Sequence, residues 1–192
     1  SHCSRMSVLI FRSYSNIFFA GMLFLTMACS SHATKQKPLF DVLESNETGI
    51  RFANTLTPTP AFNLFSYMYY YNGAGAGAGD FNRDGLTDLF FASNQQGLAL
   101  YLNKGDMHFE DVTTATGMPQ PRYWHTGVSV IDINNDGLLD IYVCSVSQYK
   151  SLQGRNLLLI CDSIDRNSVP HYSEQALQYG IGFSGFSTQA AF

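Results

Sequence analysis

A nine-residue motif rich in aspartate occurs twice in this 192-residue chain, and it constrains the fold more than any other feature. The first copy, DFNRDGLTD, covers residues 80–88, and the second, DINNDGLLD, covers residues 132–140. The second copy begins 52 residues after the first. Self-similarity at a fixed spacing of this size is typical of proteins built from stacked structural repeats. We therefore expect two equivalent units, each carrying one aspartate motif.

Both copies lie among segments that have the composition of short β-strands. In the first unit these segments are Gly73–Gly79, Leu89–Ser93, Leu98–Leu102 and Met107–Val112. In the second unit they are Thr126–Ile131, Ile141–Ser145, Asn156–Ile160 and His171–Gln175. Four short antiparallel strands in each repeat of roughly 40–60 residues are typical of a β-propeller blade. The sequence therefore predicts an all-β fold, a partial and open β-propeller of four-stranded antiparallel blades, preceded by the helix of a signal peptide.

Two more segments extend the strand pattern toward the ends of the chain. Pro38–Val42 resembles the last strand of each unit, and Thr188–Phe192 aligns with Thr126–Val130, which leads into the second motif. We therefore expect residues 38–192 to form about two complete blades and parts of two others. Because closed rings have roughly four to eight blades, the remaining blades are expected outside this sequence.

The alternating residues of each motif carry the oxygen ligands that calcium prefers. Carboxylates or amides stand at positions 1, 3, 5 and 9, the carbonyl of position 7 is available, and the glycine at position 6 permits a tight turn. The predicted ligands are Asp80, Asn82, Asp84, Leu86 and Asp88 in the first motif, and Asp132, Asn134, Asp136, Leu138 and Asp140 in the second. Because three carboxylates in one short loop repel each other, we expect binding of Ca²⁺ to be coupled to folding.

The motif has two other interpretations. An EF-hand loop begins in the same way, but it has glutamate at position 12, where this chain has Phe91 and Val143 within apolar strand-like segments. Aspartate-rich turns that bind no metal are the second alternative, and it stays open.

The N-terminal region has the pattern of an export signal. The apolar segment from Ile17 to Ala28 is too short to span a bilayer, which takes about 20 residues, but it has the length of a signal-peptide core. We predict a signal peptide over residues 1–29, whose lipobox-like end would place a lipid on Cys29, and a polar tether over residues 30–37. Cleavage after Ala33 is the alternative, and it would release a soluble secreted protein.

The sequence Gly79–Leu89, with its pattern G-D-F-N-x-D-G-x-x-D-L, resembles the FG-GAP or VCBS repeat of integrin-α-type propellers. More specifically, residues 40–192 resemble bacterial VCBS-repeat lipoproteins related to the ASPIC/UnbV and cartilage acidic protein group, of which this chain would be an N-terminal fragment. The resemblance implies calcium in the aspartate loops and a non-enzymatic adhesion or ligand-binding role, with a surface glycan or a protein as partner. It also implies a location in the bacterial cell envelope, as an outer-membrane lipoprotein held by its lipid anchor or, alternatively, as a secreted protein.

Composition and the remaining motifs exclude some functions. The 11 basic and 15 acidic residues give a formal net charge of −4, so nucleic acid is not an expected partner. The chain has no G-x-S-x-G or H-E-x-x-H sequence, so we expect no catalytic activity. The alternative is a structural or substrate-binding propeller of a larger secreted enzyme whose catalytic part lies outside this sequence.

Several side chains have more than one interpretation at this stage. The aromatic residues between positions 54 and 72 are expected to pack between blades, with stacking on sugars as the alternative. Trp124 and His125 are expected in the core rather than in a ligand site. Cys144 and Cys161 lie on successive expected strands, and pairing and free thiols are both open.

Overall fold

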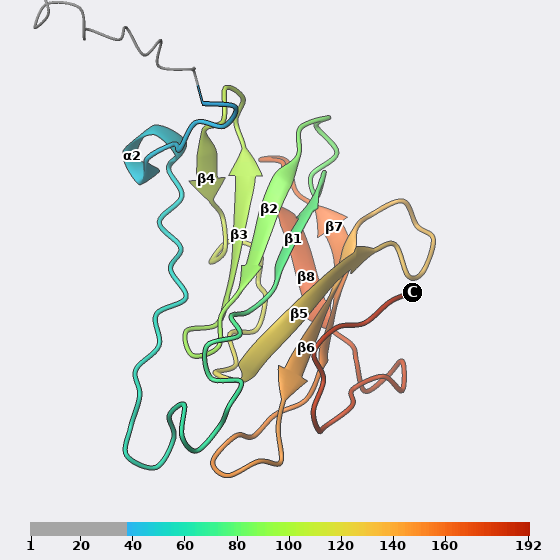
Figure 1. Ribbon diagram of the computed structural model, residues 1–192. Helices are drawn as coiled ribbons and strands as arrows, with labels where there is room; N and C mark the ends of the chain where they lie inside the picture. Colours follow the sequence, from blue (N-terminus) through green and yellow to red (C-terminus); the bar gives the residue numbers. More distant parts are fainter. Residues whose placement is uncertain (1–37) are drawn as a thin grey trace, which may run out of the picture. The chain divides into compact units, whose positions relative to one another are not determined.

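The computed structural model describes residues 38–192, which form an almost entirely β structure (Figure 1). Within this range the one helix is α2 (Ser45–Thr48), and the strands are β1 (Ala76–Gly79), β2 (Asp88–Ala92), β3 (Leu98–Asn103), β4 (Phe109–Asp111), β5 (Trp124–Ile131), β6 (Asp140–Val146), β7 (Leu157–Ile164) and β8 (Pro170–Glu174). The prediction of an all-β fold is confirmed. The expected signal peptide, Cys29 and the tether lie outside the described residues.

The eight strands form two four-stranded antiparallel sheets, each in the order of the sequence. Strands β1 to β4 make the first sheet, here called blade 1, and β5 to β8 make the second, blade 2. Gly79 pairs with Asp88 in blade 1, and Ile131 pairs with Asp140 in blade 2. Each aspartate motif is therefore the hairpin loop between the first and second strands of its blade. This arrangement is that of an open, partial β-propeller.

The innermost strands of the two blades lie side by side because β1 is made of the smallest residues (Figure 1). A Cβ added to Gly77 would lie 2.7 Å from a methyl carbon of Val130, and one added to Gly75 would lie 2.6 Å from the backbone nitrogen of Val128. Real Cβ atoms do not approach other atoms so closely. The GAGAGAG segment therefore allows blade 1 to approach blade 2 at their inner edges.

A shared hydrophobic core joins the two blades. Its buried members come from both sheets and from the first aspartate motif, and they include Phe81, Phe90, Leu100, Leu102, Ile141, Val143, Leu157 and Leu159. Each fully buried side chain of this size contributes about 1.5–3 kcal/mol relative to an exposed one. Phe81, which is completely buried, ties the first motif to this core.

Two segments that were expected to be strands are not strands in the structure. Pro38–Val42 has no strand, and the compact unit that holds both blades begins at Leu43. Thr188–Phe192 runs beside β5 without a strand's ladder of hydrogen bonds: the hydroxyl of Thr126 donates to the carbonyl of Ser187 at 2.7 Å, and that of Ser129 to Ala190 at 2.6 Å. An extended segment becomes a strand only when its backbone N–H and C=O groups pair with a neighbour, which sequence pattern alone does not ensure.

The structure also decides between the two interpretations of the cysteines. Cys144 packs with Tyr142 and Leu158, whereas Cys161 packs in the core between the blades, so the two thiols face opposite sides of blade 2. Both are free and buried. Within residues 38–192, no helix has the length and hydropathy that crossing a bilayer requires.

Candidate functional site

The first aspartate motif is a closed turn held by its own side chains. The two carboxylate oxygens of Asp80 accept hydrogen bonds from the backbone N–H groups of Asp84, at 3.0 Å, and Gly85, at 2.9 Å. The carboxylate of Asp84 accepts from the side-chain amide of Asn82, at 2.9 Å, and from the backbone of Leu86, at 2.8 Å. Residues at positions 1, 3 and 5 of the motif are therefore fixed relative to one another before any ligand is considered.

The second motif repeats this pattern at the equivalent positions. Asp132 accepts from the backbone of Asp136 at 3.0 Å and of Gly137 at 2.9 Å, and Asp136 accepts from Asn134 at 2.9 Å and from Leu138 at 2.7 Å. The turn also uses the same backbone conformation, with φ near 60° at its fourth residue and φ above 80° at its glycine. Two different sequences thus adopt one loop geometry, because the residues that determine the turn are the same.

The ninth residue of each motif is placed differently from the others. Asp88 and Asp140 are completely buried. The oxygens of Asp88 accept backbone hydrogen bonds from Phe81, at 2.9 Å, and from Asn103 at the end of β3, at 2.8 Å. Those of Asp140 accept from Ile133, at 3.0 Å, and from Cys161 of β7, at 2.8 Å. Each ninth aspartate therefore clamps its loop to the third strand of the blade, a role that the sequence did not reveal.

Burial raises the pKa of the Asp88 and Asp140 carboxyl groups. The hydrogen bonds from backbone amides lower this pKa, and the charges of the nearby aspartates raise it. Each oxygen of these groups is engaged by one amide and retains a second lone pair, so it remains able to bind a cation. The carboxylates at positions 1 and 5, by contrast, lie on partly or fully exposed residues.

The predicted ligand residues of each motif are close together in the chain and stay together in the structure. Eight of the ten predicted ligand residues lie in the two hairpin loops, and the other two, Asp88 and Asp140, are the first residues of β2 and β6. The donor atoms of all ten are oxygens of the kind that a hard dication binds. Among residues 38–192, however, no three or more carboxylate, histidine or cysteine side chains gather closely enough to form a metal site. Mutual repulsion of three carboxylates and their hydrogen bonds to backbone amides account for this spacing. Closing either loop around a cation would thus require its side chains to move inward.

Among the other side chains singled out from the sequence, most belong to the core. Phe62, Tyr67 and Tyr70 form a buried cluster with Trp124 of β5 and Val146 of β6, so these rings of the loop pack against blade 2. His125 is fully buried, with its Nδ1 atom 3.0 Å from the hydroxyl of Ser145, and burial lowers its pKa to about 4. The rings of Phe65, Tyr69 and Tyr71, from the same loop, are exposed.

The region that contains both motifs is similar to a known protein family. Residues 80–143 match the FG-GAP-like repeat. The match begins at Asp80 and ends within β6, so it includes both aspartate loops and the strands between them. A comparison with curated proteins finds no match to this chain. The chain therefore carries an FG-GAP-like repeat on a β-propeller-like fold, which supports a repeat module that binds a ligand.

Proposed function

We propose that this FG-GAP-like module is a calcium-binding, non-enzymatic part of an exported propeller that binds a glycan or a protein at the cell surface. The observation that carries the calcium assignment is the repetition of one loop geometry in two different sequences. Both loops hold aspartate, asparagine and aspartate at positions 1, 3 and 5 by matching hydrogen bonds. Carboxylate, amide and carbonyl oxygens are the ligands that Ca²⁺ takes in proteins.

The connection between each loop and its blade explains what calcium would do. Because Asp88 joins its loop to β3 and Asp140 joins its loop to β7, a cation held in the loop would also stabilise the pairing of the strands. Neutralising part of the charge of three neighbouring carboxylates would add to this effect. Calcium is therefore proposed as a structural ion, which keeps the blades in place while other surfaces contact the partner.

The expected size of the effect can be estimated from mass action. If each loop binds calcium with a Kd of about 10⁻⁴ M, as extracellular modules do, then about 1 mM free calcium stabilises the fold by about 1.4 kcal/mol per site. For a chain of this size, that corresponds to a rise in Tm of roughly 3–5 °C per site.

Thermal unfolding of the full chain with calcium and with chelator tests this proposal. We expect the calcium-dependent rise in Tm to fall by about half in Asp84→Asn and in Asp136→Asn, and to vanish in the double variant. Asp106→Asn is the matched control, because Asp106 is exposed, lies outside both motifs and has a positive φ of 49° that asparagine tolerates. Equal melting in both buffers, or an unchanged calcium response in the double variant, would contradict the assignment.

Export and lipid attachment form a separate part of the proposal, supported by the sequence of residues 1–37. Cys29 is proposed to carry the lipid, which would hold the protein in the cell envelope. Metabolic labelling with palmitate and cell fractionation test it: Cys29→Ser should lose the label and leave the membrane fraction, whereas Cys3→Ser should keep both. Release of the unchanged protein in soluble form would instead favour cleavage after Ala33.

A further inference from the structure

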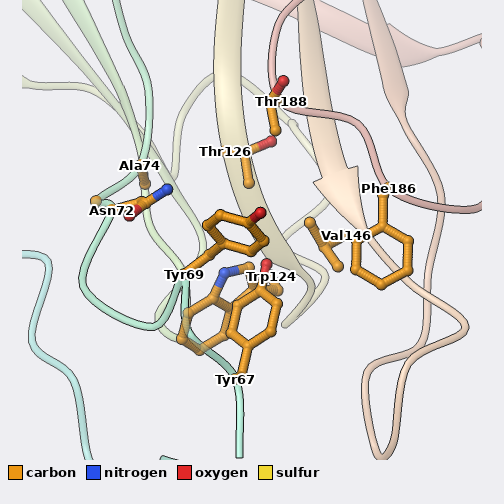
Figure 2. A pocket seen from close by; sticks show the side chains of 10 residues that line it. Tyr67, Tyr69, Asn72, Ala74, Trp124, Thr126, Val146, Phe186 and Thr188 are labelled. Carbon is orange, nitrogen blue, oxygen red and sulfur yellow. The ribbon is translucent and has the colours of Figure 1, made fainter. Parts of the chain in front are cut away.

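A pocket of about 520 Å³ lies where three inner segments of the fold meet (Figure 2). These segments are residues 72–74 before β1, the start of β5, and residues 186–188 beside β5. Its position is remote from the aspartate loops, which follow the other ends of β1 and β5. The eight residues of β5 separate the two ends by about 23 Å. The pocket is therefore a surface feature independent of the proposed calcium loops.

Aromatic rings form the walls of this pocket. Figure 2 shows Tyr67, Tyr69 and Trp124 gathered on one side and Phe186 on the other. Tyr67 and Trp124 are buried and pack edge to face, with ring centroids 5.8 Å apart. The Tyr69 ring, 5.8 Å from that of Tyr67, is 51% exposed, and Phe186 is 56% exposed. The exposed rings of Tyr69 and Phe186 thus stand beside the buried, mutually packed rings of Tyr67 and Trp124.

The polar groups of the pocket are few and uncharged. Asn72 and Thr188, both exposed, bring an amide and a hydroxyl to its rim, and Thr126 lies between them in Figure 2. No charged side chain among residues 38–192 lines the pocket. A charged ligand would therefore lose hydration without gaining a countercharge. A wholly apolar ligand would bury the amide and the hydroxyl without hydrogen bonds.

We propose that this pocket binds a neutral sugar ring of a glycan. A pyranose has apolar C–H faces that pack on aromatic rings and hydroxyl groups at its edge that need hydrogen-bond partners, which matches open rings beside an amide and hydroxyls. The volume lies within the range of small-molecule sites, about 300–1,000 Å³. The inference rests on the proposed ligand-binding function and narrows it, naming the ligand class and the residues that contact it.

The single tryptophan of the chain makes the test direct, since Trp124 lies in the pocket wall. The full chain is titrated with neutral disaccharides (cellobiose, lactose, maltose and chitobiose) and screened on an array of neutral glycans. We expect at least one of them to give a saturable change in tryptophan fluorescence. Galacturonic acid and phenylalanine amide serve as the charged and the aromatic probe, and we expect both to bind more weakly.

Variants in the same loop separate a pocket from general surface binding. Tyr69→Ala should weaken saccharide binding about tenfold, and Asn72→Ala should weaken it several-fold, since each removes one kind of contact. Phe65→Ala is the matched control, because its ring is 100% exposed in the same loop and does not line the pocket. Tyr69 and Asn72 are both exposed, so these variants are expected to fold, which near-ultraviolet circular dichroism checks.

Three results would overturn the inference: no neutral saccharide binds, binding is unchanged in Tyr69→Ala, or only the charged or aromatic probe binds. The calcium-dependent rise in Tm is measured on the same samples. If that rise is present while saccharide binding is absent, the sugar inference fails and the calcium assignment stands. If saccharide binds without any calcium response, the calcium assignment fails and the pocket stands.

Discussion

Blades 1 and 2 have the same strand order and the same aspartate loop, but their inner strands differ sharply. Strand β1 contains only glycine and alanine, whereas β5 has larger side chains that include Trp124, His125 and Val128. The two are complementary, because the bare face of β1 receives the valines of β5. The aspartate loop is thus common to both blades, whereas the inner strand determines how each blade contacts its neighbour.

The loops themselves differ in their surroundings. Asn82 of the first loop is buried, whereas its counterpart Asn134 is exposed, and Phe81 lies in the core between the blades. The guanidinium of Arg83 reaches the second loop, where it lies 3.9 Å from the place a Cβ would occupy on Gly137. The first loop therefore packs against the core between the blades through its second residue, Phe81, whereas the second loop does so through Leu138 and Leu139.

The largest expected effect comes from removing the buried ninth aspartate of the motif, which each blade has in its own loop. Asp88→Ala should lower the free energy of unfolding by about 2–6 kcal/mol, because two backbone N–H groups lose their acceptor. Asp140→Ala should do the same in blade 2. Urea denaturation in chelator measures both, and Asp88→Asn, which keeps one acceptor, should give an intermediate loss. A loss below 1 kcal/mol in both alanine variants would contradict the clamp.

The second effect belongs to blade 2 alone, because the position of His125 is occupied by Gly73 in blade 1. Burial lowers the pKa of His125 to about 4, so between its unfolded value of about 6.5 and pH 4 only the unfolded chain takes up this proton. The free energy of unfolding is therefore unaffected by this group above pH 6.5, and it decreases as the pH falls from 6.5 to 4, by up to about 3 kcal/mol. Urea denaturation across this range in chelator should show a smaller decrease in His125→Gln than in the wild type. The exposed His108→Gln is the control; identical pH profiles for all three proteins would refute the assignment.

The third prediction concerns the contact between the inner strands. Gly75→Ala should destabilise the protein by about 1–3 kcal/mol, because its Cβ would meet backbone atoms of Thr126 and Val128 that cannot move aside. Ala76→Ser, on an exposed neighbouring residue, should change stability by less than about 0.5 kcal/mol. Denaturation of both variants side by side measures this. If they behaved alike, the close approach of the blades would be wrong.

The smallest expected effect concerns the charge of Arg83 beside the second loop. Because the positive charge of Arg83 lies next to the second loop, it should weaken cation binding there. Arg83→Gln in the Asp84→Asn background should strengthen calcium binding by the second loop about two-fold at low salt. Calorimetric titration measures this affinity, and high salt should remove the difference. A weaker affinity after the change would mean that Arg83 supports the loop instead.

The strands were largely predictable from the sequence. The two terminal segments and the burial of the ninth aspartates were not, for different reasons. The β-strand composition of the segments and the position of the aspartate turn located all eight strands of residues 38–192 within a few residues. The same pattern wrongly predicted strands at Pro38–Val42 and Thr188–Phe192, because pairing depends on a neighbour that the local sequence does not describe. The ten candidate ligands were found from spacing, but the burial of Asp88 and Asp140 was not, since it follows from contacts with β3 and β7.

The repeat, the four-strand unit and the turn of each aspartate loop can be read from the amino-acid sequence, because they depend on residues close together in the chain. The burial of two aspartates, the opposite orientation of Cys144 and Cys161, and the pocket lined by aromatic rings from distant segments follow from the three-dimensional packing alone. Those features depend on how the two sheets pack. Packing is settled by shape and volume across the interface between blades, which no local pattern records.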